Sequence, residues 1–251
     1  NLRGRVVLVD DDNKTGQDYA FMNVETVYGA VAWDLGEKTT LNVSFFHSER
    51  EGRRSYGFGL FEDDDGTLSL PDISREAFIG AAYGINRGKM DFGLARLTHR
   101  FSENWALTAS AATHHTQFLW VEPFTFDFIT PANAGNIDLW DYYSSDDAHD
   151  DSQELSLTGN FEALGRTHSL VVSGYRRGSR ESYLSACCQP LGSINVCDPR
   201  PDQYQQVYRI PDDPGKDTYD TSVYGRPWRE KREETGVSAL VLLHPMERLT
   251  A

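Results

Sequence analysis

The chain has 251 residues, of which 39% are hydrophobic, and its 24 basic and 38 acidic residues give a formal net charge of −14. This acidic balance, with a pI near 4.8, argues against nucleic acid as a partner because the phosphate backbone would be repelled. No stretch reaches the roughly 18 to 20 apolar residues of a transmembrane helix. The mean hydropathy of −0.52 does not exclude membrane strands, because their polarity alternates.

Alternating polarity predicts an all-β chain of about eight antiparallel strands and a further stub. The pattern is clearest where Leu41, Val43 and Phe45 alternate with Asn42 and Ser44, which places the two sets on opposite faces. The expected strands are residues 3–9, 18–33, 39–50, 88–101, 105–121, 152–163, 167–181 and 236–244, with the stub starting at residue 249. Several exceed the roughly 9 to 11 residues that cross a bilayer, so they would continue beyond it.

Short and long connections alternate along the chain. Short polar turns are expected at residues 34–39, 102–104, 164–167 and 244–248, and long connections at residues 10–17, 51–87, 122–151 and 182–234. Because consecutive antiparallel strands place every other connection at the same end of a sheet, one end would carry tight turns and the other long loops. This asymmetry is typical of outer-membrane barrels. Soluble barrels and sandwiches usually have modest loops at both ends.

The hairpin at residues 97–109 has an aromatic residue on each side of its turn, Phe101 and Trp105. Aromatic side chains in these positions are typical of the level at which membrane strands leave the hydrocarbon. Just upstream, the apolar parity changes between Leu94 and Leu97. That change predicts either a β-bulge or a different strand register.

Two hairpins, at residues 28–41 and 97–107, resemble those of TonB-dependent siderophore receptors of the outer membrane. The first reads Asp-Leu, a short turn and Thr-Leu, and the second reads His-Arg-Phe, a short turn and Trp-Ala-Leu. The resemblance covers most of the chain from Arg3 to Ala251. It implies that residues 1–251 are part of an antiparallel transmembrane β-barrel of about 22 strands, in the outer membrane of a Gram-negative bacterium.

The resemblance also implies that the parent protein imports ferric siderophores with energy relayed through TonB. The sequence shows no signal peptide, TonB box, plug domain or final strand with an aromatic end, so we expect a fragment that lacks the plug and the C-terminal strands. The expected partners are a ferric siderophore, outer-membrane lipid, and the TonB complex through the missing N-terminal region. Two alternatives stay open: a plugless porin or adhesin barrel, and a soluble Ca²⁺-binding or glycan-active β-sandwich.

Aromatic residues crowd the expected bases of the long loops. In the resembled family, aromatic and basic residues at the outer mouth hold a planar, often anionic ferric chelate. Positive charge near this rim would come from Arg50, Arg53, Arg54, Arg176, Arg177 and Arg180. The ligand-binding candidates are Tyr56, Phe118, Trp120, Trp140, Tyr142, Arg176 and Arg177. The alternative is that these aromatic residues form an interfacial belt and small loop cores.

Other chemistry finds little support in the sequence. No Gly-x-Ser-x-Gly motif, P-loop or dinucleotide fingerprint is present, so we expect neither an enzyme nor a cofactor. The acidic runs at residues 10–12, 62–65, 146–151 and 212–213 are interpreted as solvated loops, and we expect no metal site. Three cysteines, Cys187, Cys188 and Cys197, share one expected loop. Because vicinal cysteines rarely bridge each other, Cys197 is expected to pair with Cys187 or Cys188.

Overall fold

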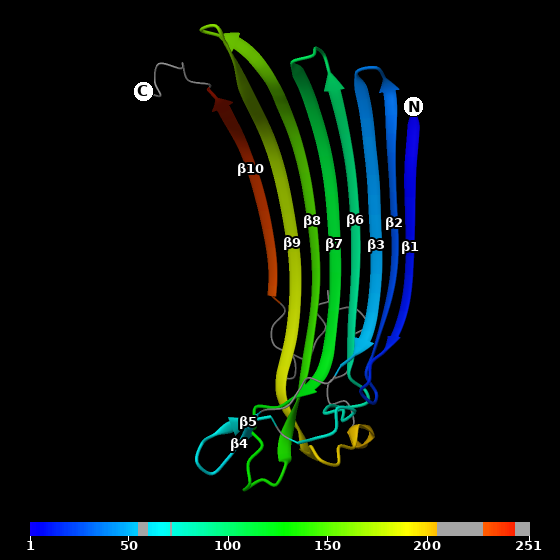
Figure 1. The fold of residues 1–251 in the computed structure, drawn as a ribbon, viewed down its shortest axis with the longest axis vertical. Coiled ribbons are helices and arrows are strands. Elements are labelled where there is room, and N and C mark those ends of the chain that lie inside the picture. Colours follow the sequence, from blue (N-terminus) through cyan, green and yellow to red (C-terminus); the bar gives the residue numbers. More distant parts are fainter. Residues whose placement is uncertain (55–59, 71, 205–227, 244–251) are drawn as a thin grey trace.

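The computed structural model describes residues 1–54, 60–70, 72–204 and 228–243. Eight long strands form one antiparallel sheet in the order β1-β2-β3-β6-β7-β8-β9-β10 (Figure 1). They are β1 (Leu2–Lys14), β2 (Phe21–Gly36), β3 (Thr39–Arg53), β6 (Ile85–Arg100), β7 (Trp105–Phe124), β8 (Asn136–Ala163), β9 (Arg166–Asn195) and β10 (Trp228–Leu242). The short strands β4 (Phe61–Glu62) and β5 (Leu68–Ser69) pair with each other, and η1 (Pro201–Gln203) is a single 3-10 turn. Within the described ranges, no helix is long and apolar enough to cross a membrane.

Tight turns join the strands at one end of the sheet and long connections join them at the other (Figure 1). The predicted turns between β2 and β3, β6 and β7, and β8 and β9 are confirmed. The last of these is made by Leu164 and Gly165, whose φ angles of 53° and 74° are both positive. Positive φ at both positions matches the twist of the flanking strands, as in type I′ hairpins. The predicted turn at 244–248 and the stub from 249 lie outside the described residues.

The strands extend further toward the long connections than the alternating pattern predicted. β8 starts at Asn136 instead of residue 152, and β9 ends at Asn195 instead of residue 181. Acidic residues 10–12 and 146–151 therefore lie in β1 and β8, and their assignment to loops was wrong. A strand that is polar on both faces lacks the alternation that identifies a half-buried strand, yet its backbone still pairs with its neighbours.

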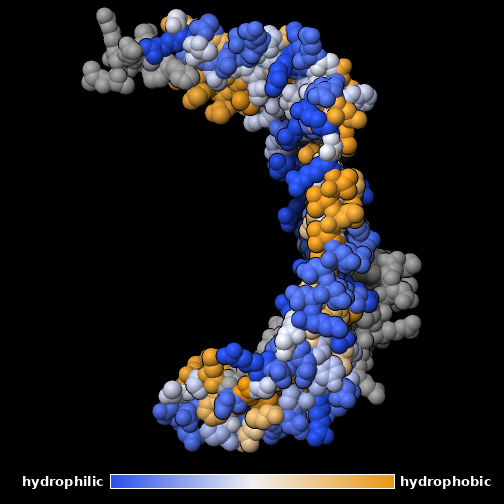
Figure 2. Space-filling model, turned by 45° about the vertical axis from the view of Figure 1, so that its right-hand side comes forward, coloured by the Kyte–Doolittle hydropathy of each residue, from blue (hydrophilic) through white to orange (hydrophobic). Residues whose placement is uncertain are grey.

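Hydrophobic side chains line one face of the sheet at the turn end, which we call the apolar face. Leu41, Leu97, Ala109 and Leu155 are successive cross-strand partners in one of its rows. Phe45 and Leu155 are 52% and 53% exposed, so nothing in the described chain covers this surface. Figure 2 shows a hydrophobic patch on the strands bounded by hydrophilic residues. A contiguous exposed apolar band fits the lipid contact of a membrane barrel.

The polar boundary of this band runs obliquely across the sheet. On β2 the first charged residue beyond the band is Glu25, and the cross-strand row that begins there reaches Ser182 on β9. On β9, however, the first charged residue is Arg176, six positions nearer the turn end. The polar boundary is therefore displaced by about 20 Å along the strands between β2 and β9, which lie about five strand spacings apart. If the boundary follows the membrane plane, the strands are tilted by roughly 40° from the membrane normal. Membrane barrels have strand tilts of about 35–45°.

The opposite face, which we call the polar face, carries the hydrophilic half of the alternation. One row is built from hydroxyl side chains, with Thr98 Oγ1 3.3 Å from Thr108 Oγ1 and Ser173 Oγ 2.8 Å from Ser238 Oγ. β6 keeps a continuous register with both neighbours, so the expected bulge is absent. Leu94 simply lies on the polar face while Leu97 lies on the apolar face, which explains the change of parity.

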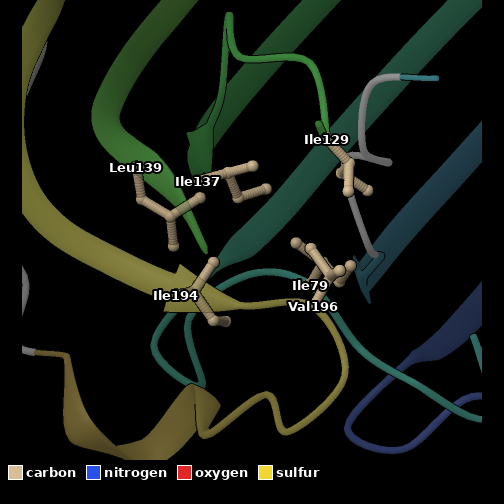
Figure 3. Close-up of a cluster of buried hydrophobic side chains, with 6 residues drawn as sticks. All are labelled: Ile79, Ile129, Ile137, Leu139, Ile194 and Val196. Carbon is tan, nitrogen blue, oxygen red and sulfur yellow. The ribbon is translucent and has the colours of Figure 1, made fainter. Parts of the chain in front are cut away.

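The outer ends of β8 and β9 are fixed by a small hydrophobic core. Figure 3 shows side chains from these strands converging with residues of the long connections. The core residues are Ile79, Ile129, Ile137, Leu139, Ile194 and Val196, each no more than 4% exposed. Burying an aliphatic side chain of this size stabilises a fold by about 1.5–3 kcal/mol. The core thus anchors the segments that follow β5, β7 and β9 near the outer end of the sheet.

Candidate functional site

An aromatic and arginine cluster lies on the polar face near the outer ends of β3, β7, β8 and β9. The outer cluster consists of Arg50, Arg54, Phe118, Trp120, Phe124, Tyr142 and Tyr183. Strand pairing sets its base, because Arg50, Gly88, Phe118, Asp146 and Tyr183 are successive cross-strand partners. Side chains in such a row project from the same face of the sheet.

Gly88 creates the space for one of the cationic contacts. The Arg50 guanidinium carbon lies 5.5 Å from the centroid of the Phe118 ring, although β6 separates the two strands. A Cβ atom on Gly88 would come within 2.6 Å of Arg50 Nε. A glycine inside a strand often marks such a close approach. Gly88 therefore lets Arg50 cross β6 and stack on Phe118.

The rings of the outer cluster contact one another edge to face. Trp120 lies 6.3 Å from Phe118 and 5.5 Å from Tyr142, measured between ring centroids. Phe124 lies 6.2 Å from Tyr142, and the Tyr142 and Tyr183 hydroxyl groups are 3.4 Å apart. Edge-to-face pairs contribute about 0.5–1.5 kcal/mol beyond their buried area. Mutual contact thus holds the rings in place.

A buried carboxylate holds the second arginine. The Arg54 guanidinium carbon lies 4.9 Å from the Trp120 ring centroid, and Arg54 Nε lies 3.6 Å from Glu122 Oε2. The Glu122 side chain is only 2% exposed. Burial raises the pKa of Glu122, and its interactions with Trp120 and Arg54 offset part of that rise. Glu122 therefore positions Arg54 over the indole at the start of the connection that follows β3.

This arrangement suits a planar, anionic and partly aromatic ligand. Aromatic edges and faces offer van der Waals contact with a flat ligand, and the stacked guanidinium groups offer positive charge and planar hydrogen-bond donors. Stacking a cation on an aromatic ring contributes about 0.5–1 kcal/mol at an exposed site.

The structure brings part of the predicted ligand-binding set together. Phe118, Trp120 and Tyr142 meet in the outer cluster, as their rings are in contact. Trp140 lies on β8 opposite Phe124, close to the same group. Tyr56 lies outside the described residues. Whether these residues bind a ligand stays a prediction.

Arg176 and Arg177 do not join the outer cluster. Arg176 pairs with Gln153 and Thr235 and belongs to the apolar face, because adjacent strand residues point to opposite sides. Arg177 lies on the polar face, but it is six residues from Tyr183, or about 20 Å along the strand. Its guanidinium carbon lies 5.0 Å from the centroid of the Tyr175 ring. The structure therefore does not bring these two arginines to the outer cluster, and whether they bind a ligand stays a prediction.

The cluster also includes Arg50 and Arg54, and it is supported by Gly88 and Glu122. Sequence reasoning used these four residues only in part. The two arginines were recognised as rim charges, yet nothing in their local pattern distinguished them from Arg176. The position of Gly88 could have been noticed in the sequence, because an isolated glycine at the start of an alternating run often marks the close approach of another group. Glu122 could also have been noticed in the sequence, because it is a lone carboxylate among aromatic neighbours.

The cysteine pairing differs from the expectation. Cys187 and Cys188 form a vicinal disulfide, and Cys197 is a free, exposed thiol. The expected bridge assumed a flexible loop, whereas β9 continues to Asn195. Eight extended residues span about 26 Å, far beyond the Cα separation of about 5.5–6 Å that a disulfide needs. Among the residues with described placement, no group of three or more His, Cys, Asp or Glu is arranged to hold a metal ion.

Sequence comparison relates the chain to two pyoverdine receptors. It is 27% identical over 176 residues to the ferripyoverdine receptor of Pseudomonas aeruginosa, an alignment that covers 68% of the chain. It is 26% identical over 204 residues to the ferric-pyoverdine M114 receptor PbuA of Pseudomonas sp. strain M114, which covers 79% of the chain. The alignments span 21% and 24% of these relatives, so the chain corresponds to about a quarter of their length or less. No family model matches the chain.

Solved structures with the same fold are siderophore receptors. The chain aligns over 98% of its length with 31% of FpvA of P. aeruginosa bound to heterologous pyoverdines, with a TM-score of 0.78 and 18% identity. It aligns over 96% of its length with 37% of the ferric-catecholate import receptor Fiu of E. coli K12, with a TM-score of 0.69 and 13% identity. The chain is therefore similar in sequence to pyoverdine receptors and shares its fold with siderophore receptors of known structure, and its sheet fits part of an outer-membrane β-barrel.

Proposed function

We propose that the protein to which this chain belongs binds ferric siderophores at the outer cluster and imports them. One observation carries the proposal: stacked arginines and packed aromatic rings share the polar face well beyond the apolar band. A ligand there would meet charge and aromatic surface while still outside the lipid. The relatives are named for ferripyoverdine, which supports a ferric pyoverdine as the first ligand to test. The ligand would be transported without chemical change.

We also propose that residues 1–251 form one section of a larger barrel that is energised through TonB. The edge strands β1 and β10 each pair with one described neighbour. In a bilayer, every backbone N–H and C=O group must find a partner, so open edges are not tolerated there. Further strands would complete the pairing. The TonB contact and a plug would belong to parts of the protein other than this sheet.

The test is a binding titration of the full-length protein with ferric pyoverdine, using Gly88→Ala and Trp120→Ala. Gly88→Ala should displace Arg50 from Phe118 while leaving the strand intact. Trp120→Ala removes the ring that contacts both Phe118 and Tyr142. We expect each variant to weaken binding by about tenfold, the equivalent of about 1.4 kcal/mol.

Gly174→Ala is the matched control on the apolar face. A Cβ atom on Gly174 would lie 3.9 Å from its nearest neighbour, the carbonyl oxygen of Gly236, which is an ordinary van der Waals contact. It should bind like the wild type. Equal affinity of all variants and the wild type would place the ligand elsewhere. Failure of the wild-type protein to bind ferric pyoverdine would contradict the assignment of this ligand. Iron-limited growth on ferric pyoverdine, with and without the gene, tests import separately.

A further inference from the structure

A groove of about 760 Å³ crosses the apolar face between β3 and β10. Its floor is made of small residues, including Gly93, Ala95 and Ala111. Toward β9 and β10 its wall is cationic, with Arg176, Arg180 and Lys231. The groove is therefore apolar on one side and basic on the other.

The cations of this wall are crowded against one another. Arg180 and Lys231 are direct cross-strand partners, and like charges in such positions destabilise a sheet. Glu233 lies 2.8 Å from Lys231 Nζ and 3.8 Å from an Arg176 guanidinium nitrogen. Arg180 also acts electrostatically on Glu233, so three cations share this carboxylate.

The other carboxylate of the groove, Asp151, is engaged by His149, with 3.0 Å between Oδ2 and Nε2. The basic wall thus carries more positive charge than its carboxylates neutralise. A multiply charged anion at this wall would relieve the repulsion between Arg180 and Lys231.

The groove also crosses the boundary of the apolar band. Ala95 and Ala111 lie within the band, whereas Arg176 is the first charged residue beyond it on β9. A hydrocarbon chain laid on the small residues of the floor would therefore end beside the basic wall. An amphiphile with an anionic head has that distribution of apolar and charged groups.

We propose that this groove binds a phosphate-bearing lipid of the outer leaflet. Its acyl chain lies over Gly93, Ala95 and Ala111, and its phosphate meets Arg176, Arg180 and Lys231. Phosphate oxygens accept the planar fork of donors that a guanidinium presents, and an ammonium adds a compact positive charge. The site is on the opposite face of the sheet from the outer cluster. It would hold the barrel at a defined height and orientation in the membrane.

Native mass spectrometry of the full-length protein, titrated in detergent with lipid A and with dephosphorylated lipid A, tests the proposal. The wild type should bind lipid A at least about tenfold more tightly than the dephosphorylated form. The double variant Arg180→Gln/Lys231→Gln should lose this preference. The matched control is Arg96→Gln, which removes a positive charge from the polar face and should keep the preference.

Equal binding of the two lipids by the wild type would overturn the proposal without need of any variant. The same conclusion would follow if the double variant kept the wild-type preference. If inorganic phosphate displaced lipid A at equal concentration, the groove would be a simple anion site, and the proposal of a lipid site would also be overturned. Ferric pyoverdine binding measured in parallel should be unchanged in the double variant.

Discussion

Leu157→Arg should destabilise the barrel strongly, whereas Thr158→Arg should not. Leu157 pairs with Leu107 and Val172 on the apolar face, and its strand continues the apolar band on both sides of it. An arginine on the lipid face costs about 2–4 kcal/mol near the bilayer midplane. This energy corresponds to a reduction of about 30- to 700-fold in the folding equilibrium constant. Thr158 belongs to the polar face, where an arginine stays hydrated.

The assay is denaturant unfolding of the full-length protein reconstituted in lipid vesicles, followed by tryptophan fluorescence. The two substitutions add the same side chain at adjacent positions. Because Thr has a higher strand propensity than Leu, strand propensity would act against the expected difference. The measured quantity is the free energy of unfolding of each variant relative to the wild type. Equal stability of Leu157→Arg and Thr158→Arg would refute the assignment of the two faces.

Three further predictions concern single positions. Gly159→Ala should destabilise the sheet by about 1–3 kcal/mol in the same unfolding assay, because the Trp105 ring occupies the space of the new methyl group, whereas Gly174→Ala should cost little. Burial raises the pKa of Glu122 above its usual 4.5. Its contribution to stability is therefore fully present below about pH 4.5 and is lost as pH rises through the raised pKa, so Glu122→Gln should flatten the pH dependence of unfolding in that window. Maleimide should label one thiol, Cys197, in the untreated protein and three after reduction, and labelling of a different cysteine before reduction would contradict the pairing.

The membrane half of the fold could be predicted from sequence because lipid imposes a strict alternation there. Leu41, Val43 and Phe45 identified β3 and its faces, and the pairing of β3 with β6 confirmed them. The outer half could not be predicted in the same way. Residues 146–151 are almost all polar on both faces of β8, so the period of two is missing there.

The sequence pointed to several residues of the candidate site but not to the contacts between them. Phe118 and Trp120 are two positions apart on one strand, so their common face follows from the sequence alone. The partnership of Arg50 with Phe118 depends on strand pairing and on the missing side chain of Gly88. Arg176 was misplaced because rim position was inferred from the loop boundaries, and β9 continues well past the boundary that was assumed.

The strands are long enough to place the outer cluster far from the apolar band. On β7 the apolar band ends near Ala111, and Trp120 lies nine residues further, or about 30 Å along the strand. A molecule held at Trp120 has therefore been removed from the medium but has not yet entered the membrane. Under the proposed function, two sets of defects follow: one that abolishes ligand binding at the cell surface, and one that keeps surface binding but stops import.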